Sequence, residues 1–142
     1  MQTKKFSQEL HDQFDSIARE KAKQLFKRYR MTLEDNPDKY GIDLIAYKDG
    51  ELYGYVEVEV REAWTGEHFK YDTLNIPYRK RKLFLNPQRN CLVAFNSDCT
   101  YAFIVDEMTI LFSDVQEVKN KHLPEGEMFF KVPVSELKKV KV

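Results

Sequence analysis

Two strand-like stretches joined by a short turn constrain the fold of this 142-residue chain more than any other feature. Residues Ile42–Tyr47 and Leu52–Val60 are rich in β-branched and aromatic residues, and Lys48-Asp49-Gly50-Glu51 between them has the composition of a hairpin turn. In the second stretch, valines alternate with Glu57 and Glu59, so the two carboxylates share one face about 7 Å apart. The sequence therefore predicts an antiparallel hairpin with an apolar face and an acidic face.

The length of the turn decides on which face Asp43 lies. A two-residue turn pairs Asp43 with Val56 and places the carboxylate among the valines. A loop of odd length, residues 49–51 with Gly50 at positive φ, pairs Asp43 with Glu57 and sets apolar residues opposite apolar ones. The same register pairs two further sets across the hairpin: Ile45 with Tyr55 and Tyr47 with Tyr53. We therefore predict the odd register, which gathers Asp43, Glu57 and Glu59 on one face.

The remaining elements are predicted from periodicity and from residues that end helices and strands. An apolar stripe at helical spacing predicts an N-terminal helix; the stripe consists of Leu10, Phe14, Ile17, Ala18, Ala22, Leu25 and Tyr29. Asn36-Pro37-Asp38 marks a loop, and Pro77 is expected to open a short helix that runs through Leu85. We predict further strands at Cys91–Asn96, Tyr101–Val105, Thr109–Phe112 and Met128–Val132, and a helical turn at Ser135–Lys138.

This order of elements predicts an α/β or α+β domain with a central mixed sheet flanked by helices. No repeat, low-complexity tract or flexible linker divides the sequence, so we expect residues 1–142 to form one domain. The chain has no apolar run long enough for a membrane span and no leader-like start, and we therefore expect a cytoplasmic protein. Cys91 and Cys99 are too few for a disulfide framework and do not have metal-ligand spacing.

Charge is balanced over the whole chain but divided along it. The sequence contains 23 Lys and Arg against 23 Asp and Glu. Residues 31–72 carry four basic and eleven acidic side chains, whereas residues 73–97 carry five basic and no acidic ones. The zero net charge therefore excludes only indiscriminate electrostatic binding of nucleic acid, and it leaves local recognition of phosphate open.

Three carboxylates on one side of a hairpin repel one another unless a cation compensates their charge. Oxygen ligands without His or Cys favour Mg²⁺ or Mn²⁺ over zinc, and such an ion lowers the pKa of its bound water and stabilises charge on a phosphate under attack. The alternative is that Glu57 and Glu59 form the solvated face of an edge strand, but that alternative does not explain Asp43 inside an apolar strand. We therefore predict a Mg²⁺ or Mn²⁺ site at Asp43, Glu57 and Glu59.

The arrangement of these acids resembles the PD-(D/E)XK nuclease superfamily. Asp43 is separated by thirteen residues from Glu57-Val58-Glu59, and both lie on successive predicted strands after a helix. The resemblance covers about residues 5–97 and implies a restriction-endonuclease-like fold, with Asp43, Glu57 and the main-chain carbonyl of Val58 as metal ligands. The superfamily usually has Lys at the position of Glu59. Some restriction endonucleases depart from the pattern in the same way and carry an ExE motif. Two alternatives stay open: Glu59 binds metal or orients the attacking water, or catalysis has been lost.

The densest basic run, Arg79-Lys80-Arg81-Lys82, is predicted to bind a nucleic-acid backbone. Arg79 and Lys80 are the candidate phosphate ligands. Either can also supply the cation missing from position 59, which makes Lys80 a candidate catalytic residue. The alternative is a solvated basic helix face, because four consecutive cations cannot all face one site.

Three aromatic residues are candidates for stacking on the bases of a single-stranded substrate, and core packing is the alternative for each. They are Trp64, Tyr71 and Tyr78.

Three functions are compatible with these patterns. The first is a Mg²⁺-dependent nuclease that hydrolyses DNA, with RNA as the second substrate class. The second is a catalytically inactive protein that keeps the nuclease fold and binds nucleic acid or inhibits another protein. The third is an interaction domain in which the acidic and basic blocks of two copies pair in a homodimer.

Overall fold

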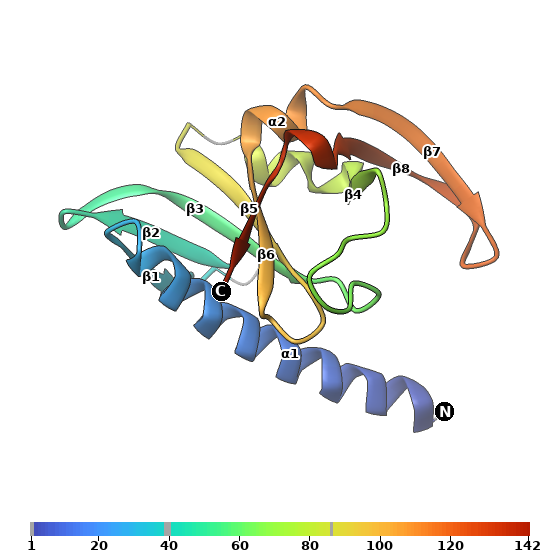
Figure 1. Ribbon diagram of the computed structural model, residues 1–142, viewed down its shortest axis with the longest axis horizontal. Helices are drawn as coiled ribbons and strands as arrows, with labels where there is room; N and C mark the ends of the chain where they lie inside the picture. The colour runs from blue at the N-terminus through green and yellow to red at the C-terminus, as the bar shows by residue number, and fades with distance from the viewer. Residues whose placement is uncertain (1, 39–40, 86) are drawn as a thin grey trace.

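The computed structural model describes residues 2–38, 41–85 and 87–142, with side chains described from residue 15 onward. It has an α+β fold that combines a mixed six-stranded sheet with a three-stranded sheet (Figure 1). The coarse prediction of an α+β fold with a mixed sheet is therefore confirmed. In the described part of the chain, none of the helices is both long and apolar enough to cross a membrane.

The six-stranded sheet has the order β1-β2-β3-β5-β6-β9. Its strands are β1 (Met31–Asp35), β2 (Leu44–Lys48), β3 (Glu51–Val60), β5 (Arg89–Phe95), β6 (Tyr101–Asp106) and β9 (Lys138–Lys141). The two central strands, β3 and β5, run parallel, and every other neighbouring pair in this sheet is antiparallel. The segment between β3 and β5 therefore crosses from one end of the sheet to the other.

That crossover contains β4 (Thr73–Pro77) and the 3₁₀ helix η1 (Tyr78–Phe84). β4 pairs with β8, which also pairs with β7, and this second sheet is antiparallel throughout. The remaining elements are α1 (Gln2–Lys27), α2 (Glu107–Leu111), β7 (Asp114–Asn120), β8 (Leu123–Pro133) and the 3₁₀ helix η2 (Val134–Glu136). α1 runs along the bottom of Figure 1, and the β7–β8 hairpin extends away from it at the upper right.

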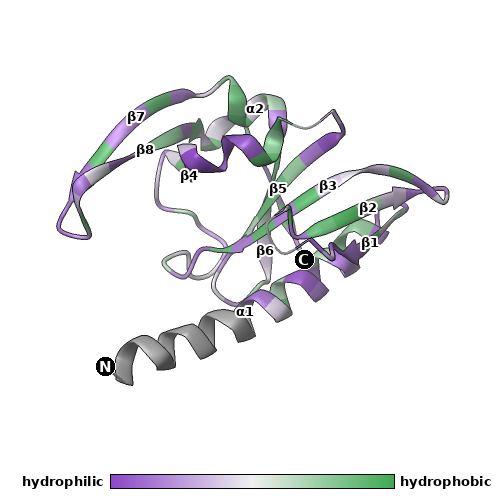
Figure 2. Cartoon of the chain, turned by 180° about the vertical axis from the view of Figure 1, so that it is seen from behind, coloured by the Kyte–Doolittle hydropathy of each residue, from purple (hydrophilic) through white to green (hydrophobic). Residues whose placement is uncertain are grey.

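Each face of the six-stranded sheet has its own apolar core. Val56 and Val58 pack with the α1 side chains Ala22 and Leu25 on one face. On the other face, buried residues of β5 and β6 pack with β4, η1 and β8; they include Leu92, Ala94, Phe103, Leu74, Ile76, Phe84 and Phe130. Hydrophobic residues accordingly dominate the central strands in Figure 2. Alternation along β3 sends its glutamates to the face opposite α1.

The N-terminal helix is confirmed, but its buried stripe differs from the prediction in two positions. Ala18, Ala22 and Leu25 are buried as expected, whereas Ile17 and Tyr29 are exposed. Ile17 lies one residue, or about 100° around the helix, from Ala18. The helix ends at Lys27, so Tyr29 lies beyond its last turn. Two predicted stripe residues, Leu10 and Phe14, lie outside the described side chains.

The prediction of a strand at Thr109–Phe112 is wrong because Asp106 starts a helix there. The Asp106 side chain accepts a hydrogen bond from the Thr109 N–H at 2.8 Å, which caps the first turn of α2. The short helix after Pro77 is confirmed as η1. At the predicted turn of helix Ser135–Lys138, η2 covers 134–136 and strand β9 begins at Lys138.

The hairpin reaches the predicted register by a different route. Lys48 pairs with Glu51 across a two-residue turn in which Asp49 and Gly50 have φ of 54° and 80°, so the predicted three-residue loop is wrong. A bulge follows, because Ala46 pairs with Gly54 and Tyr47 pairs with Leu52 rather than with Tyr53 as predicted, which leaves Tyr53 as the extra residue. Beyond the bulge the pairs are Ile45 with Tyr55 and Leu44 with Val56, which is the odd register.

We expect Gly54→Ala to destabilise the fold, because a β-carbon on Gly54 would collide with the main-chain carbonyl oxygen of Arg89 on β5. Overpacking of this kind costs about 1–3 kcal/mol of the free energy of unfolding, measured by chemical denaturation. Leu52→Ala, at an exposed position of the same strand, is the control and should cost less. Equal stability of Gly54→Ala and the unsubstituted chain would contradict the close approach of β3 and β5.

Candidate functional site

Asp43 and Glu57 meet where β2 begins beside β3. Asp43 lies in the bend directly before Leu44, and its Oδ2 accepts a hydrogen bond from the main-chain N–H of Val58 at 2.8 Å. Three residues further along, on the opposite side of the strand, the main-chain N–H of Arg61 donates to the Phe95 carbonyl of β5 at 2.8 Å. Because residues alternate along a strand, the N–H and the carbonyl of Val58 both face Asp43 rather than β5.

Asn36, at the end of β1, holds the segment that carries Asp43. Its side-chain amide donates to the Ile42 carbonyl at 2.8 Å, and its main-chain N–H donates to the Asp43 carbonyl at 3.0 Å. Its side-chain oxygen accepts from the Asp38 N–H at 3.1 Å. The Asn-Pro-Asp pattern predicted a loop here, but the sequence gives no sign of which carbonyls Asn36 binds. Asn36 is therefore a positioning residue that the sequence alone does not reveal.

Glu57 is a buried acid with one nearby cation and one nearby anion. The residue is 7% exposed. Burial, together with the negative charge of Asp43, raises the pKa of Glu57 to about 7, although Lys80 acts in the opposite direction. The Nζ of Lys80 lies 3.3 Å from Oε2 of Glu57 and 3.5 Å from Oε2 of Glu59. Glu57 is consequently a carboxyl that changes its charge near neutral pH.

Glu59 has two cationic partners. Besides Lys80, the Arg61 guanidinium binds its carboxylate through Nε at 2.7 Å and also through a terminal nitrogen. Arg61 in turn donates to the Asn75 carbonyl of β4 at 2.7 Å, which ties the end of β3 to the second sheet. The sequence pattern singled out Glu59 but not Arg61, since an arginine just past a strand is usually solvated.

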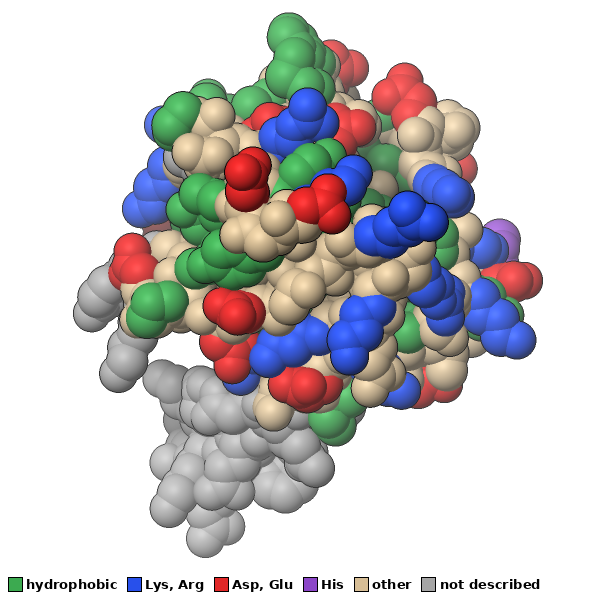
Figure 3. Space-filling view, turned by 90° about the vertical axis from the view of Figure 1, so that its left-hand side faces the viewer, with side chains coloured by type: hydrophobic (Ala, Val, Ile, Leu, Met, Phe, Trp, Pro, Cys, Tyr) green, Lys and Arg blue, Asp and Glu red, His purple; other side chains and the backbone are tan. Residues whose placement is uncertain are grey.

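The basic run does not act as one unit. Lys80 points to the acids and its side chain is 20% exposed, whereas that of Arg79 is 71% exposed and pairs with Glu127 of β8 at 3.1 Å. The Arg81 guanidinium lies 4.4 Å from the centre of the Tyr78 ring, and Lys82 is exposed. Figure 3 shows one face of the molecule. Lys and Arg side chains gather toward its right-hand side, and acidic and basic side chains are interspersed over the rest of it.

The predicted metal ligands are only partly brought together. Among the side chains that the structure describes, from residue 15 onward, no group of three or more His, Cys, Asp or Glu is arranged to hold a metal ion. Asp43 and Glu57 are close enough for one to raise the pKa of the other, and the Val58 carbonyl faces the same edge. Two carboxylates and a carbonyl fit Mg²⁺, which is often held by one or two carboxylates and keeps several waters. Glu59 fits less well, because Lys80 and Arg61 already compensate its charge.

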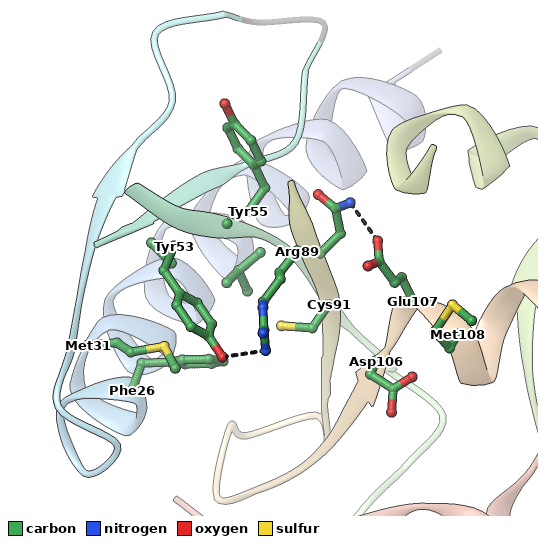
Figure 4. Close-up of a pocket in the computed structure, with 13 residues that line it drawn as sticks. Phe26, Met31, Tyr53, Tyr55, Arg89, Cys91, Asp106, Glu107 and Met108 are labelled. Atoms are coloured by element: carbon green, nitrogen blue, oxygen red, sulfur yellow. Dashed lines mark hydrogen bonds between the residues drawn. The ribbon is translucent and has the colours of Figure 1, made fainter. Parts of the chain in front are cut away.

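A cavity of about 550 Å³ elsewhere on the molecule contains none of the predicted acids (Figure 4). Its lining includes Tyr53 and Arg89, and the Arg89 guanidinium donates to the Tyr53 hydroxyl at 3.1 Å. Burial, followed by the negative charges of Asp106 and Glu107, raises the pKa of the Cys91 thiol there to about 12. Cys91 is therefore protonated at neutral pH and is a poor nucleophile and a poor metal ligand.

Comparisons with protein-family models, with curated proteins and with solved structures find no match to this chain. The function of this chain is therefore inferred from its residues and their geometry. The relevant features are the buried Glu57 beside the half-buried Asp43, the lysine between Glu57 and Glu59, and the open edge of β3 at Val58.

We expect the Glu57→Gln variant to remove a pH dependence of stability. Between the ordinary pKa of 4.5 and about 7, the folded chain holds a proton on Glu57 that the unfolded chain has released. The free energy of unfolding therefore falls as pH rises through this window, by on the order of 3 kcal/mol, and then levels off. Glu57→Gln lacks this fall, so in EDTA its stability relative to the unsubstituted chain should increase from pH 5 to pH 8.

The measurement is chemical denaturation at several pH values. Glu51→Gln, on an exposed part of the same strand, is the matched control and should keep the original slope. Parallel stability curves for Glu57→Gln and the unsubstituted chain would show that Glu57 titrates as an ordinary glutamate.

Proposed function

We propose that this protein is a Mg²⁺- or Mn²⁺-dependent nuclease with a restriction-endonuclease-like fold that hydrolyses DNA, with RNA as the second substrate class. The observation that carries the proposal is a buried carboxyl, Glu57, that lies beside Asp43 at an open strand edge and carries a pKa near neutrality. Buried acids with pKa values moved by both burial and a second charge are concentrated at functional sites.

The arrangement of the elements supports the same proposal. A helix precedes the hairpin, Asp43 stands at the start of one strand, and Glu57 and Glu59 lie on the next. The chain then crosses over through η1 and returns as β5, parallel to β3. This is the order that the resemblance to PD-(D/E)XK nucleases implies for the acidic residues.

Asp43, Glu57 and the Val58 carbonyl are the proposed metal ligands. A bound Mg²⁺ or Mn²⁺ would lower the pKa of a water molecule and stabilise charge on the phosphate. Asp43 also fixes the edge of β3 through the Val58 N–H, and Lys80 lowers the pKa of Glu57 and so favours its ionised, metal-binding form.

Glu59 is proposed to position the cations rather than to replace the lysine of the family motif. Its carboxylate holds Lys80 on one side and Arg61 on the other. Lys80 is thereby placed beside Glu57, where its ammonium can bind a phosphate oxygen or orient the attacking water. The role of Glu59 as a direct metal ligand or a base stays a prediction.

A catalytically inactive nucleic-acid-binding or inhibitor protein is the second candidate. It is favoured by the compensation already present at the site, since Lys80 and Arg61 offset two of the three negative charges without a metal. The two candidates differ in whether Asp43 and Glu57 bind a cation.

We expect Mg²⁺ or Mn²⁺ to raise the melting temperature of the unsubstituted chain and to support cleavage of DNA. A ligand that binds only the folded state at 100 times its Kd adds about 2.7 kcal/mol of stability. Asp43→Asn and Glu57→Gln should each lose both the thermal shift and the cleavage, and Glu51→Gln should keep both. A thermal shift without cleavage would favour the inactive candidate, and a shift retained in both variants would exclude the proposed metal site.

We expect Lys80→Ala and Arg79→Ala to have different effects. Because Lys80 lowers the pKa of Glu57, its removal should raise that pKa further and move the pH profile of cleavage to higher pH. The rate at pH 7 should fall by at least about a hundredfold, the lower range for loss of a group that is positioned for the transition state. Arg79→Ala breaks only an exposed ion pair with Glu127 and should leave the profile unchanged. Identical profiles for the two variants would contradict the role of Lys80.

A further inference from the structure

A second cavity opens at the end of β3 next to the candidate site. It has a volume of about 750 Å³, within the range of roughly 300–1,000 Å³ typical of pockets that hold small organic groups. Arg61 belongs to its wall and also binds Glu59, so the cavity and the acidic site share one side chain. β-strands rise about 3.3 Å per residue, which places Arg61 about 13 Å from Glu57 along the strand. A DNA strand crosses that distance in about four stacked nucleotides or fewer extended ones.

The structure separates the three aromatic residues that the sequence nominated for base stacking. Trp64 is 3% exposed and stacks on Phe103 with a centroid distance of 4.8 Å, so it belongs to the core. Tyr78 packs against Phe130 at 5.1 Å and is also covered by Arg81. Tyr71 differs from both, because it is 53% exposed and lines the cavity.

The Tyr71 ring is exposed but supported. Its neighbour Phe69 meets it edge to face at 5.6 Å, and Phe69 itself contacts Trp64 and Phe103 in the core, each at 5.4 Å. A ring held by an aromatic cluster loses little conformational entropy when a second ring stacks on it. This arrangement offers a preformed surface for a flat aromatic group.

Cationic side chains accompany that surface. The Nζ of Lys70 lies 5.2 Å from the centre of the Tyr71 ring, and Lys131 of β8 lines the cavity with Arg61. A flat apolar surface beside several cations matches the chemistry of a nucleotide, which presents an aromatic base and an anionic phosphate. The Glu62 and Asp72 carboxylates also line the cavity, which makes a purely anionic ligand a poorer match than a base with one phosphate.

We propose that this cavity binds an unpaired nucleotide of the strand that lies across Asp43 and Glu57, with the base on Tyr71 and the phosphate near Lys70 and Lys131. The proposal rests on the proposed nuclease function and names its substrate class as DNA with a single-stranded segment. A base inside a duplex is stacked and paired, so it cannot reach Tyr71 without leaving the helix.

Fluorescence anisotropy in EDTA tests this proposal without cleavage. The probes are a labelled single-stranded DNA oligonucleotide of mixed sequence and the duplex of the same sequence. The unsubstituted chain should bind the single strand more tightly than the duplex. Tyr71→Ala should weaken binding of the single strand by at least about fivefold, the lower limit for loss of one base–aromatic stack. Tyr71→Phe keeps the ring and should bind within twofold of the unsubstituted chain.

Phe112→Ala is the matched control, because Phe112 is 80% exposed and does not line this cavity. Thermal melts of each variant check that the fold is intact, since both side chains are exposed. The proposal is contradicted by equal effects of Tyr71→Ala and Phe112→Ala, by equal affinity for single strand and duplex, or by no binding of the single strand. Binding that depends on Tyr71 in a chain without a metal response would overturn the nuclease and keep the nucleotide site. A metal response with no effect of Tyr71→Ala would keep the nuclease and overturn the nucleotide site.

Discussion

The burial of Glu57 beside Asp43 is the constraint on which the rest of this structure depends. A carboxylate in the middle of a sheet, opposite Leu92 on the next strand, is costly unless it is protonated or compensated. Asp43 increases that cost by its charge, and Lys80 reduces it from η1. A fold selected only for stability would carry an apolar residue at position 57. The crossover from β3 to β5 carries Lys80, and the segment before β2 carries Asp43. Each of them brings a charged side chain close to Glu57.

Three local features of the backbone bring these groups together. The bulge at Tyr53 corrects the register that the two-residue turn would otherwise impose, so that Leu44 pairs with Val56 and Asp43 comes to the end of the pairing, beside Glu57. Asn36 fixes the segment before β2 by binding the Ile42 and Asp43 carbonyls. Gly54 lets β5 approach β3 closely. None of the three residues is a proposed metal ligand, yet together they set the positions of Asp43 and of the strand that carries Glu57.

The sequence predicts the hairpin, the buried central strands and the acids, because alternation of apolar and polar residues is a direct consequence of a strand with one buried face. It fails where burial is weak. β1 and β7 bury few side chains, so their sequences carry little periodic signal. The sequence predicts a strand at 109–112 where the structure has α2, because a single capping interaction by Asp106 starts a helix there. Long-range packing, which no local pattern records, decides three side-chain directions. Lys80 points to Glu57, Arg79 points away to Glu127, and Arg61 binds Glu59.

A crystal structure of the chain soaked in Mn²⁺ tests the central claim most directly, because anomalous scattering locates the ion independently of the fold. The account predicts one anomalous peak that is coordinated by the carboxylates of Asp43 and Glu57 and by the Val58 carbonyl, with water in the remaining positions and Lys80 beside it. A structure that binds no ion at this edge at saturating Mn²⁺, with the Lys80 ammonium still seated between Glu57 and Glu59, would contradict it.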